Sequence, residues 1–348
     1  MIQAEDAAAE GWTAPGFESA ASAFDSQLER GLHEGAQLCV MLGGQVVLER
    51  HGGFTDASRR RRVGVDTPFM VFSATKALTA ASIHKLADEG ALELEAPVAD
   101  YWPAFAARGK GGITIEQLLL HQAGLACQAR PADLAAWLLP GGGARRVRAM
   151  APAHEPGAKV VYHAFSAGFA LGELIRRASG MGAARYLEKV FLEPLGMKDS
   201  SAGLRFRDFP RAALLRSADP EQEAPARLFS NPLYRRAYLP AASLNSSARD
   251  LAAFYDMLRA GGERGGRRYL SARAVARATE LRYDGPDGDT GRRIRWALGF
   301  GLGGYSPFPD RDIRHMGRGA TERTFGHSGQ GGCAFGWADP PSGLVFAF

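Results

Sequence analysis

A serine and a lysine three residues apart are the residues of this sequence best suited to chemistry. Ser73-Ala74-Thr75-Lys76 follows an apolar stretch and opens a segment whose pattern predicts a helix over 73–89. Side chains three residues apart share one face of a helix, so the amine would lie beside the hydroxyl. A lysine with a lowered pKa can activate a serine hydroxyl as a nucleophile. The unpaired N–H groups of a first helical turn can also stabilise an oxyanion.

The same spacing recurs nine residues later, as Ser82 and Lys85. Ser82 would lie in the middle of the predicted helix, roughly half a rotation away from Ser73 and far from free N–H groups. We therefore favour Ser73 as the nucleophile and Lys76 as its base. The alternative for Ser73 is a purely structural helix N-cap.

A tyrosine near the middle of the sequence is a third candidate. Tyr162 lies just before a predicted helix over 167–178. A phenol can carry protons when nearby cations favour its ionised form. The alternative is a tyrosine that only packs, in the core or at the surface.

A glycine-rich segment near the end of the sequence contains His327-Ser328-Gly329-Gln330. Glycine lets the backbone approach a ligand closely, and an edge strand here could offer the N–H of Gln330 as a second oxyanion donor. The alternative is an ordinary turn between two strands. Ser328 nearly matches the nucleophile elbow G-x-S-x-G, but Gln330 takes the fifth position and no helix pattern follows, which argues against an α/β-hydrolase.

The surrounding patterns predict one sheet built from both ends of the sequence. Strands are predicted at 37–42, 45–50, 296–302, 324–327, 333–338 and 344–348, with a Gly43-Gly44 turn between the first two. Helical patterns occur at 17–33, 115–121, 167–178, 182–192 and 248–258. We expect a sheet domain from residues 17–80 and 245–348, a mostly helical domain over 81–244, and the active site between them. The last strand pattern stops abruptly, so we expect a sequence cut short before a terminal helix that would cover the sheet.

The composition is that of a soluble globular protein, with 348 residues, 46% of them hydrophobic and 23% charged. No apolar run approaches the ~18 residues that span a membrane, and residues 1–16 lack the basic start and apolar stretch of a signal peptide. Cys39, Cys127 and Cys333 form no CxxC pair, which favours reduced thiols and a cytoplasmic location.

Charge and histidine placement give little support to other kinds of site. The net charge is +5, and the densest basic run is Arg59–Arg62. Without a nucleic-acid motif or interleaved aromatic residues, we interpret this run as a solvated loop and expect no nucleic-acid partner. The histidines are scattered and no phosphate-binding loop occurs, so we expect neither a metal nor a cofactor.

The order of the three segments resembles the serine β-lactamase and penicillin-binding-protein superfamily, and within it the class C-related serine hydrolases that include the family VIII carboxylesterases. Further similar landmarks are at 118–125, 156–157, 193–197 and 246–251, so the resemblance extends from about residue 20 to the end. It implies an α+β fold, an antiparallel sheet flanked by helices with a mostly helical insertion.

The same resemblance implies roles for individual residues. Ser73 would be acylated while Lys76 and Tyr162 share the proton transfers. The backbone N–H groups of Ser73 and Gln330 would bind the oxyanion, and His327, Ser328 and Gly329 would contact the substrate.

Two departures from the family pattern bear on the substrate. Ala164 stands where the second motif usually has Asn, and His327 stands where the third motif often has Lys. Both changes remove groups that would bind an anionic amide, so we expect a small, neutral ester as substrate. The alternatives are a β-lactamase or D-alanyl-peptide hydrolase, an acyltransferase, and a non-catalytic binding module. Trp102, Tyr238 and Trp296 are candidates to line the pocket, with ordinary core or surface packing as the favoured alternative for each. The oligomeric state stays open.

Overall fold

The computed structural model describes residues 8–126, 136–139, 141–217, 219–308, 310–312 and 314–348. Cys39 and Cys333 are free thiols, while Cys127 lies outside the described residues. None of the helices in the described part of the chain is both long and apolar enough to cross a lipid bilayer.

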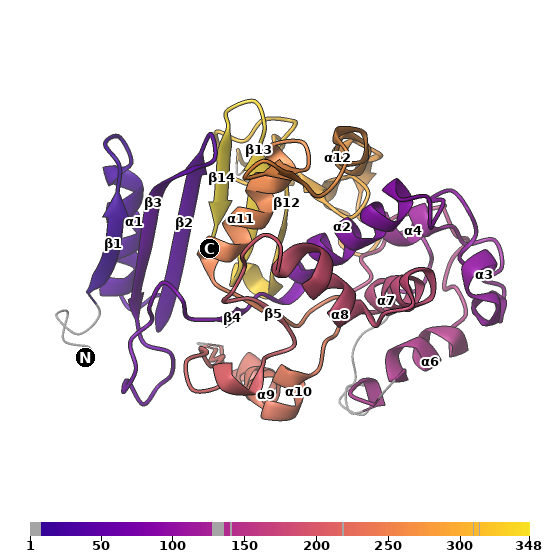
Figure 1. The fold of residues 1–348 in the computed structure, drawn as a ribbon, viewed down its shortest axis with the longest axis horizontal. Coiled ribbons are helices and arrows are strands. Elements are labelled where there is room, and N and C mark those ends of the chain that lie inside the picture. The colour runs from indigo at the N-terminus through magenta and orange to yellow at the C-terminus, as the bar shows by residue number, and fades with distance from the viewer. Residues whose placement is uncertain (1–7, 127–135, 140, 218, 309, 313) are drawn as a thin grey trace.

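Within the described residues, a nine-stranded antiparallel sheet combines strands from the two ends of the chain (Figure 1). In spatial order its strands are β1 Ala9–Thr13, β3 Gln45–Gly53, β2 Gly35–Leu42, β14 Leu344–Ala347, β13 Phe335–Asp339, β12 Phe325–Ser328, β11 Gly301–Leu302, β10 Arg293–Trp296 and β9 Tyr283–Pro286. The late strand β14 therefore pairs with the early strand β2 on one side and with β13 on the other. The predicted α+β fold, with its sheet built from both chain ends, is confirmed.

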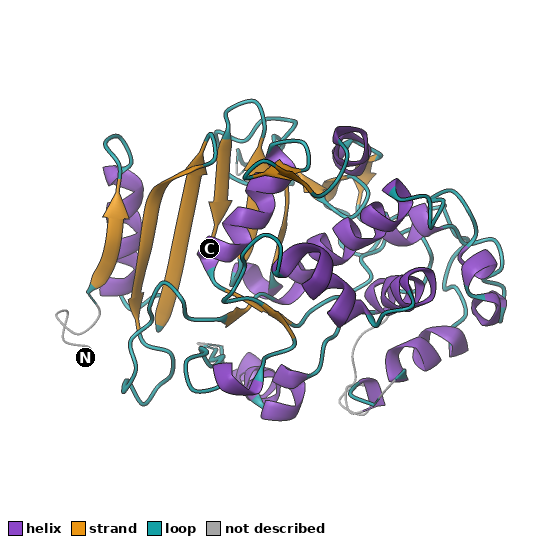
Figure 2. Cartoon of the chain, in the orientation of Figure 1, coloured by secondary structure: helices purple, strands orange, loops and turns teal. Residues whose placement is uncertain are grey.

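Helices flank this sheet and fill the region inserted between its two halves (Figure 2). They are α1 Glu18–Glu29, α2 Thr75–Asp88, α3 Val98–Tyr101, α4 Ile115–Leu119, α6 Gly142–Ala149, α7 Ser166–Ser179, α8 Ala183–Leu187, α9 Pro220–Ser230, α10 Pro232–Arg236, α11 Ala248–Arg259 and α12 Ala272–Thr279. The helices α3, α4, α6 and α7 gather on the side of the molecule away from β1–β3 (Figure 1). The division into two domains with the stated boundaries stays a prediction.

Strand β2 is apolar on both faces because helices pack on both sides of the sheet. Leu38 and Val40 belong to the core that includes residues of α1, whereas Cys39 and Met41 belong to the core that includes residues of α11. Successive side chains of a strand point to opposite faces. The continuous apolar run of β2 is therefore explained by the burial of both its faces, between α1 on one side and α11 on the other.

Helix α2 runs through the core between the sheet and the inserted helices. Eleven of its fourteen residues are buried, and it contacts α7, α12 and β12. Small side chains allow this close packing: a Cβ added to Gly299 would lie 2.3 Å from the Cβ of Ala80. Helix α2 is thus packed against several other elements, and this packing also fixes the position of its first turn.

A small sheet anchors the segment that leads into α2. In it, β6 Leu244–Ser246 pairs with β4 Phe69–Met70 on one side and with β5 Ser201–Ala202 on the other. A separate two-stranded ribbon pairs β7 Glu263–Arg264 with β8 Arg267–Arg268. The N–H of Val71 continues the β4–β6 pairing by donating to the carbonyl of Leu244 at 3.0 Å. The segment around residue 70, which leads into α2, is therefore hydrogen-bonded to the segment around residue 245.

Several predicted elements differ from the observed ones in physically informative ways. The predicted strand over 296–302 is split into β10 and β11, because Gly299 has a φ of +93° and Ala297 donates its N–H to the carbonyl of Phe300, closing a tight turn. The predicted helix over 17–33 ends at Glu29, followed by Gly31 with a φ of +68°, a usual helix terminator. Strand β1 was not predicted, since only five residues form it at an edge of the sheet.

Candidate active site

The predicted nucleophile lies in a single 3₁₀ turn, η2 Phe72–Ala74, directly before α2. The predicted helix therefore starts as a 3₁₀ turn and becomes α-helical at Thr75. Phe72 has a φ of +45°, a conformation that is uncommon outside glycine and costs about 1–2 kcal/mol. The pairing of β4 with β6 and the buried α2 hold this backbone from both sides.

Lys76 lies beside Ser73, as the three-residue spacing predicts. Its Nζ is 3.0 Å from the Ser73 Oγ and donates a second hydrogen bond of 3.0 Å to the carbonyl oxygen of Ala241. The lysine side chain is buried, and this burial lowers its pKa to about 7. A substantial fraction of the amine is therefore neutral near pH 7 and can accept the proton of the Ser73 hydroxyl.

The repeated Ser-x-x-Lys spacing further along α2 has no comparable setting. Ser82 is buried and donates its hydroxyl to the carbonyl of Leu78 in its own helix at 2.9 Å. Lys85 forms an ion pair with Glu89 at 2.9 Å. Both side chains are engaged in structural contacts, so only the first of the two pairs lies at a helix start beside a cavity.

Tyr162 approaches the same lysine from the segment that precedes α7. The Lys76 Nζ lies 4.9 Å from the centre of the Tyr162 ring, within the range of a cation–π contact. Desolvation raises the pKa of Tyr162, and a hydrogen bond to Ser73 acts in the opposite direction. The phenol is therefore protonated near neutral pH, so it is a proton donor there and not the ionised base considered from the sequence.

The third predicted segment lies at the end of β12. His327 is buried, and its Nδ1 donates to the carbonyl of Ser328 at 2.8 Å. Burial and the nearby Lys76 lower the pKa of His327 to about 3. The ring is therefore neutral, and its Nε2 is a buried acceptor without a protein partner among the described residues.

The prediction of an edge strand here is wrong, because β12 pairs with β13 on one side and with β11 on the other. The strand ends before Gln330, which instead opens the 3₁₀ turn η6 Gln330–Gly332. The chain turns here because Gly331 has a φ of +62°. A Cβ added to Gly329 would lie 2.9 Å from the carbonyl oxygen of Val71. Glycine thus allows this turn to approach the nucleophile segment closely.

A cavity of about 360 Å³ brings the three segments together. It is lined by Phe72, Ser73, Tyr162, Ala164, Phe165, Ala242, Trp296, Gly301, His315, Gly326, His327, Ser328, Gly329 and Gln330. The predicted catalytic, oxyanion-binding and substrate-binding residues all line the cavity except Lys76, which contacts Ser73 through its 3.0 Å hydrogen bond. Among the described lining residues none has a carboxylate, ammonium or guanidinium group, and burial lowers the pKa of both histidines. The cavity is therefore largely apolar and has no charged side chain at its described surface.

The aromatic residues proposed to line the pocket are divided between two places. Trp296 lines the cavity beside Ser73. Trp102 and Tyr238 do not line this cavity but a separate hollow next to α6 and α7, so the packing alternative, and not the pocket role, fits these two residues. Phe165 and His315 line the cavity without having been predicted, because nothing in their sequence surroundings distinguishes them from packing residues.

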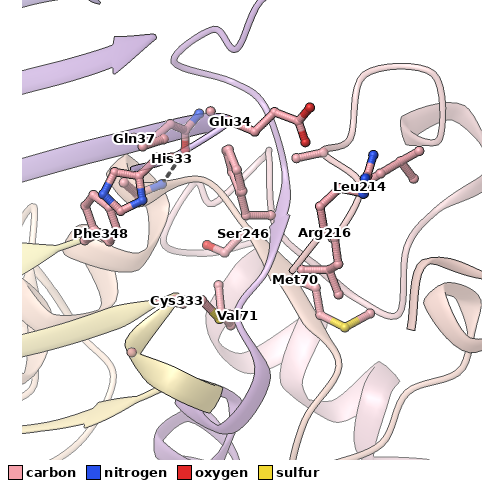
Figure 3. A pocket seen from close by; sticks show the side chains of 18 of the residues that line it. His33, Glu34, Gln37, Met70, Val71, Leu214, Arg216, Ser246, Cys333 and Phe348 are labelled. Carbon is pink, nitrogen blue, oxygen red and sulfur yellow. Dashed lines mark hydrogen bonds between the residues drawn. The ribbon is translucent and has the colours of Figure 1, made fainter. Parts of the chain in front are cut away.

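A second, larger cavity of about 470 Å³ uses the immediate sequence neighbours of the site residues (Figure 3). Val71 and Cys333 line it, together with Met70, Leu214 and Phe348. Desolvation raises the pKa of the Cys333 thiol to about 11, so this thiol is a weak nucleophile near neutral pH. Volume alone therefore does not identify the reactive cavity; the Ser73–Lys76 pair does.

The described residues offer no obvious metal site, since no group of three or more His, Cys, Asp or Glu side chains is placed to hold an ion there. The histidines nearest Ser73 are neutral and engage backbone groups instead. His163, for example, accepts the N–H of Leu125 at its Nε2 at 2.8 Å.

Comparisons with known proteins agree with this geometry. The Beta-lactamase family model matches residues 20–348. The protein named esterase/beta-lactamase LipL from Mycobacterium tuberculosis is 32% identical over 367 residues, covering 96% of this chain and 80% of that protein. The crystal structure of a family VIII carboxylesterase has a TM-score of 0.83 at 33% identity, covering 97% of this chain and 92% of the other. A penicillin-binding-protein homologue from Caulobacter crescentus has a TM-score of 0.84 at 32% identity, with the same coverage of 97% and 92%. The predicted resemblance is confirmed: the chain belongs to the beta-lactamase family.

Proposed function

We propose that this protein hydrolyses small, neutral carboxylic esters through an acyl intermediate on Ser73. The observation that carries the proposal is the Ser73 hydroxyl 3.0 Å from the amine of a buried lysine with a pKa of about 7. A nucleophile and a base within hydrogen-bond reach are the minimum for covalent acyl transfer. Relatives named as esterases and carboxylesterases support this enzyme class.

In the first half of the reaction, neutral Lys76 takes the proton of Ser73 as the Oγ attacks the ester carbonyl. The backbone N–H groups of Ser73 and Gln330 stabilise the oxyanion of the tetrahedral intermediate; losing one such donor typically raises the barrier by ~3–4 kcal/mol. When the intermediate collapses, Tyr162 gives its proton to the departing alkoxide and regains one from the Lys76 ammonium. The alcohol leaves, and the acyl group remains on Ser73.

In the second half, water attacks the acyl-serine. Lys76 is neutral again and accepts the proton of that water, while Tyr162 stays hydrogen-bonded at Ser73. Collapse of the second intermediate returns the proton to the Ser73 Oγ and releases the carboxylic acid. The enzyme is regenerated with no external reductant, oxidant or metal in the scheme.

The preference for neutral esters is supported by the uncharged cavity. An anionic substrate would lose its hydration there and find no permanent cation at the cavity surface, which is costly. The neutral ring of His327 and the methyl group of Ala164 occupy the positions where the family pattern has groups that bind such substrates. The name of the LipL relative includes both activities, so β-lactam hydrolysis is the second candidate function.

Covalent labelling and turnover with matched serine variants test the proposal. S73A should lose hydrolysis of 4-nitrophenyl butyrate by at least ~10³-fold and should not react with a fluorophosphonate, whereas S82A should keep both. Mass spectrometry of wild type mixed with ester should find the added acyl mass on Ser73. Turnover retained in S73A, or no turnover and no labelling of wild type, would refute the proposal, the second result favouring a binding module.

Substrate competition distinguishes the remaining alternatives. A chromogenic cephalosporin turned over faster than the nitrophenyl ester would favour the β-lactamase, and release of D-alanine would favour the peptide hydrolase. Adding methanol and measuring the ratio of methyl ester to free acid separates hydrolysis from acyl transfer. A product that is mainly methyl ester at low methanol would favour the acyltransferase.

We also propose that residues 17–80 with 245–348, and residues 81–244, act as two domains with the catalytic cavity between them. The cavity supports this division because Tyr162 comes from the inserted part and His327 from the sheet. We further propose a cytoplasmic location, supported by the free thiols of Cys39 and Cys333.

A further inference from the structure

We propose that His121 is a positioning residue that fixes Tyr162 against Lys76. The inference rests on the proposed function, in which Tyr162 protonates the leaving group. His121 does not line the catalytic cavity, so it acts through Tyr162 and not on the substrate. Three independent features of this histidine carry the inference.

The first feature is a pair of hydrogen bonds on either side of the tyrosine. Tyr162 lies in a stretch without helix or strand, so neighbouring groups must set its position. The carbonyl oxygen of His121 accepts the N–H of Val161 at 3.0 Å. The Nδ1 of the same residue accepts the N–H of His163 at 3.1 Å. One residue therefore clamps both backbone N–H groups that flank Tyr162.

The second feature is direct contact between the two rings. The His121 and Tyr162 ring centres are 4.6 Å apart with an interplanar angle of 49°. His121 also contacts Trp296, with ring centres 5.3 Å apart. The phenol ring thus has the imidazole beside it and the Lys76 Nζ within 4.9 Å of its centre. Loss of the imidazole would give the Tyr162 ring room to turn away from the lysine.

The third feature is a side chain at a backbone position that normally favours glycine. Helix α4 ends in a Schellman arrangement: the His121 N–H donates to the carbonyl of Leu118 at 3.2 Å, and the Gln122 N–H donates to that of Gln117 at 2.8 Å. His121 occupies the left-handed position of this arrangement, with a φ of +56°. Glycine would adopt this conformation without strain. The strained histidine is 4% exposed, so its side chain serves an internal contact.

The protonation state of the imidazole fits a fixed acceptor. Because Nδ1 accepts an N–H, the single proton of the neutral ring is on Nε2. Burial, together with the neighbouring His163, Lys76 and His327, lowers the pKa of His121 well below its usual value. The ring therefore stays neutral across the working pH range and does not take part in proton transfer itself.

Leaving-group dependence distinguishes positioning from general structural support. An alkyl ester needs a proton on its departing alkoxide, whereas a nitrophenolate leaves without one. We expect Y162F to lower kcat/KM for ethyl butyrate by about 10²-fold and that for 4-nitrophenyl butyrate by less than about 10-fold. H121G, which relieves the backbone strain and removes the acceptor and the ring, should lower the ethyl ester value at least about 10-fold and the nitrophenyl value less than about 3-fold.

Conservative rescue and a double variant complete the test. H121N keeps an acceptor oxygen near the position of Nδ1 and tolerates a left-handed backbone, so it should remain within about 3-fold of wild type on both esters. The kcat/KM of the double variant H121G/Y162F for the ethyl ester should lie within about 3-fold of that of Y162F, because both changes remove the same proton transfer. If H121G does not fold, H121F replaces it, since it fills the space without an acceptor.

A buried histidine in another helix, α2, provides the matched control. His84 is also buried, and its imidazole bonds the carbonyl of Leu298 at 2.9 Å. H84A should lower the melting temperature without changing the ratio of ethyl to nitrophenyl activity. Equal losses on both esters in H121G, or multiplicative losses in the double variant, would overturn the positioning role. Unchanged ethyl ester turnover in Y162F would instead refute the role of Tyr162 in the proposed function.

Discussion

Replacing Lys76 by methionine should stabilise the protein near neutral pH while abolishing its catalysis. Burial lowers the pKa of this lysine from an ordinary 10.5 to about 7. In the unfolded chain the amine binds its proton up to about pH 10.5. Folding must therefore release that proton, or bury it, at every pH below this value.

The magnitude follows from proton linkage. Between about pH 7 and 10.5 the unfolded chain holds more protons than the folded chain, so the wild-type free energy of unfolding rises with pH in this window. At 1.36 kcal/mol per pKa unit, the buried lysine costs about 4 kcal/mol at pH 7 and less than about 1 kcal/mol at pH 10. Methionine has a similar length but leaves the carbonyl of Ala241 without its hydrogen bond, at a cost of about 1–3 kcal/mol.

The two contributions predict that the difference in unfolding free energy between K76M and wild type changes sign with pH. K76M should be more stable than wild type by about 1–3 kcal/mol at pH 7 and no more stable, or less stable, at pH 10. Urea unfolding followed by circular dichroism at pH 7, 8, 9 and 10 measures both curves. K85M is the matched control on the same helix, because Lys85 is in a partly exposed ion pair whose removal should cost at most ~1 kcal/mol. A difference between K76M and wild type that stays constant from pH 7 to 10, or K76M less stable at pH 7, would refute the reasoning.

Three further outcomes follow from the site. The kcat/KM for a neutral ester should fall about tenfold per pH unit below pH 7 as Lys76 is protonated, reaching about 1% of its plateau at pH 5; a flat profile from pH 8 to 5 would contradict a lysine base. H327K should raise the ratio of carboxylate-bearing to neutral ester turnover by about 10-fold, measured with a matched ester pair, and an unchanged ratio would show that this position does not contact the acyl or alcohol group. G329A should lower kcat by about 10-fold or more with little change in KM, because its Cβ would lie 2.9 Å from the Val71 carbonyl oxygen; wild-type kcat would mean that the turn can shift without moving the oxyanion donors.

Much of the fold could be predicted because its elements carry strong local signals. The Gly43-Gly44 turn and the two apolar strands around it predict the β2–β3 hairpin, which the structure contains. The spacing of Ser73 and Lys76 predicts their proximity on a helix, and the atoms are 3.0 Å apart. Such features depend on residues close together in sequence, where periodicity and turn chemistry decide the geometry.

Other features could not be predicted because they depend on distant contacts. The pKa of Lys76 is set by burial among residues distant in sequence, such as Ala241, which lies 165 positions away. The split of the predicted strand over 296–302 depends on one positive φ at Gly299. His121 gave no chemical signal, since a histidine in an apolar landmark reads as a core residue, and its left-handed backbone is visible only in the structure.

The place of β14 in the sheet has a consequence for how the molecule assembles during synthesis. The hairpin of β2 and β3 emerges first, but the strand that covers its free edge, β14, begins only at Leu344. Until then the edge of β2 is an open template for other chains, and pairing across some 300 residues is entropically slow. We expect the growing chain to need protection of that edge on the ribosome, and a β14 peptide added in trans to reduce aggregation of a chain that stops before it.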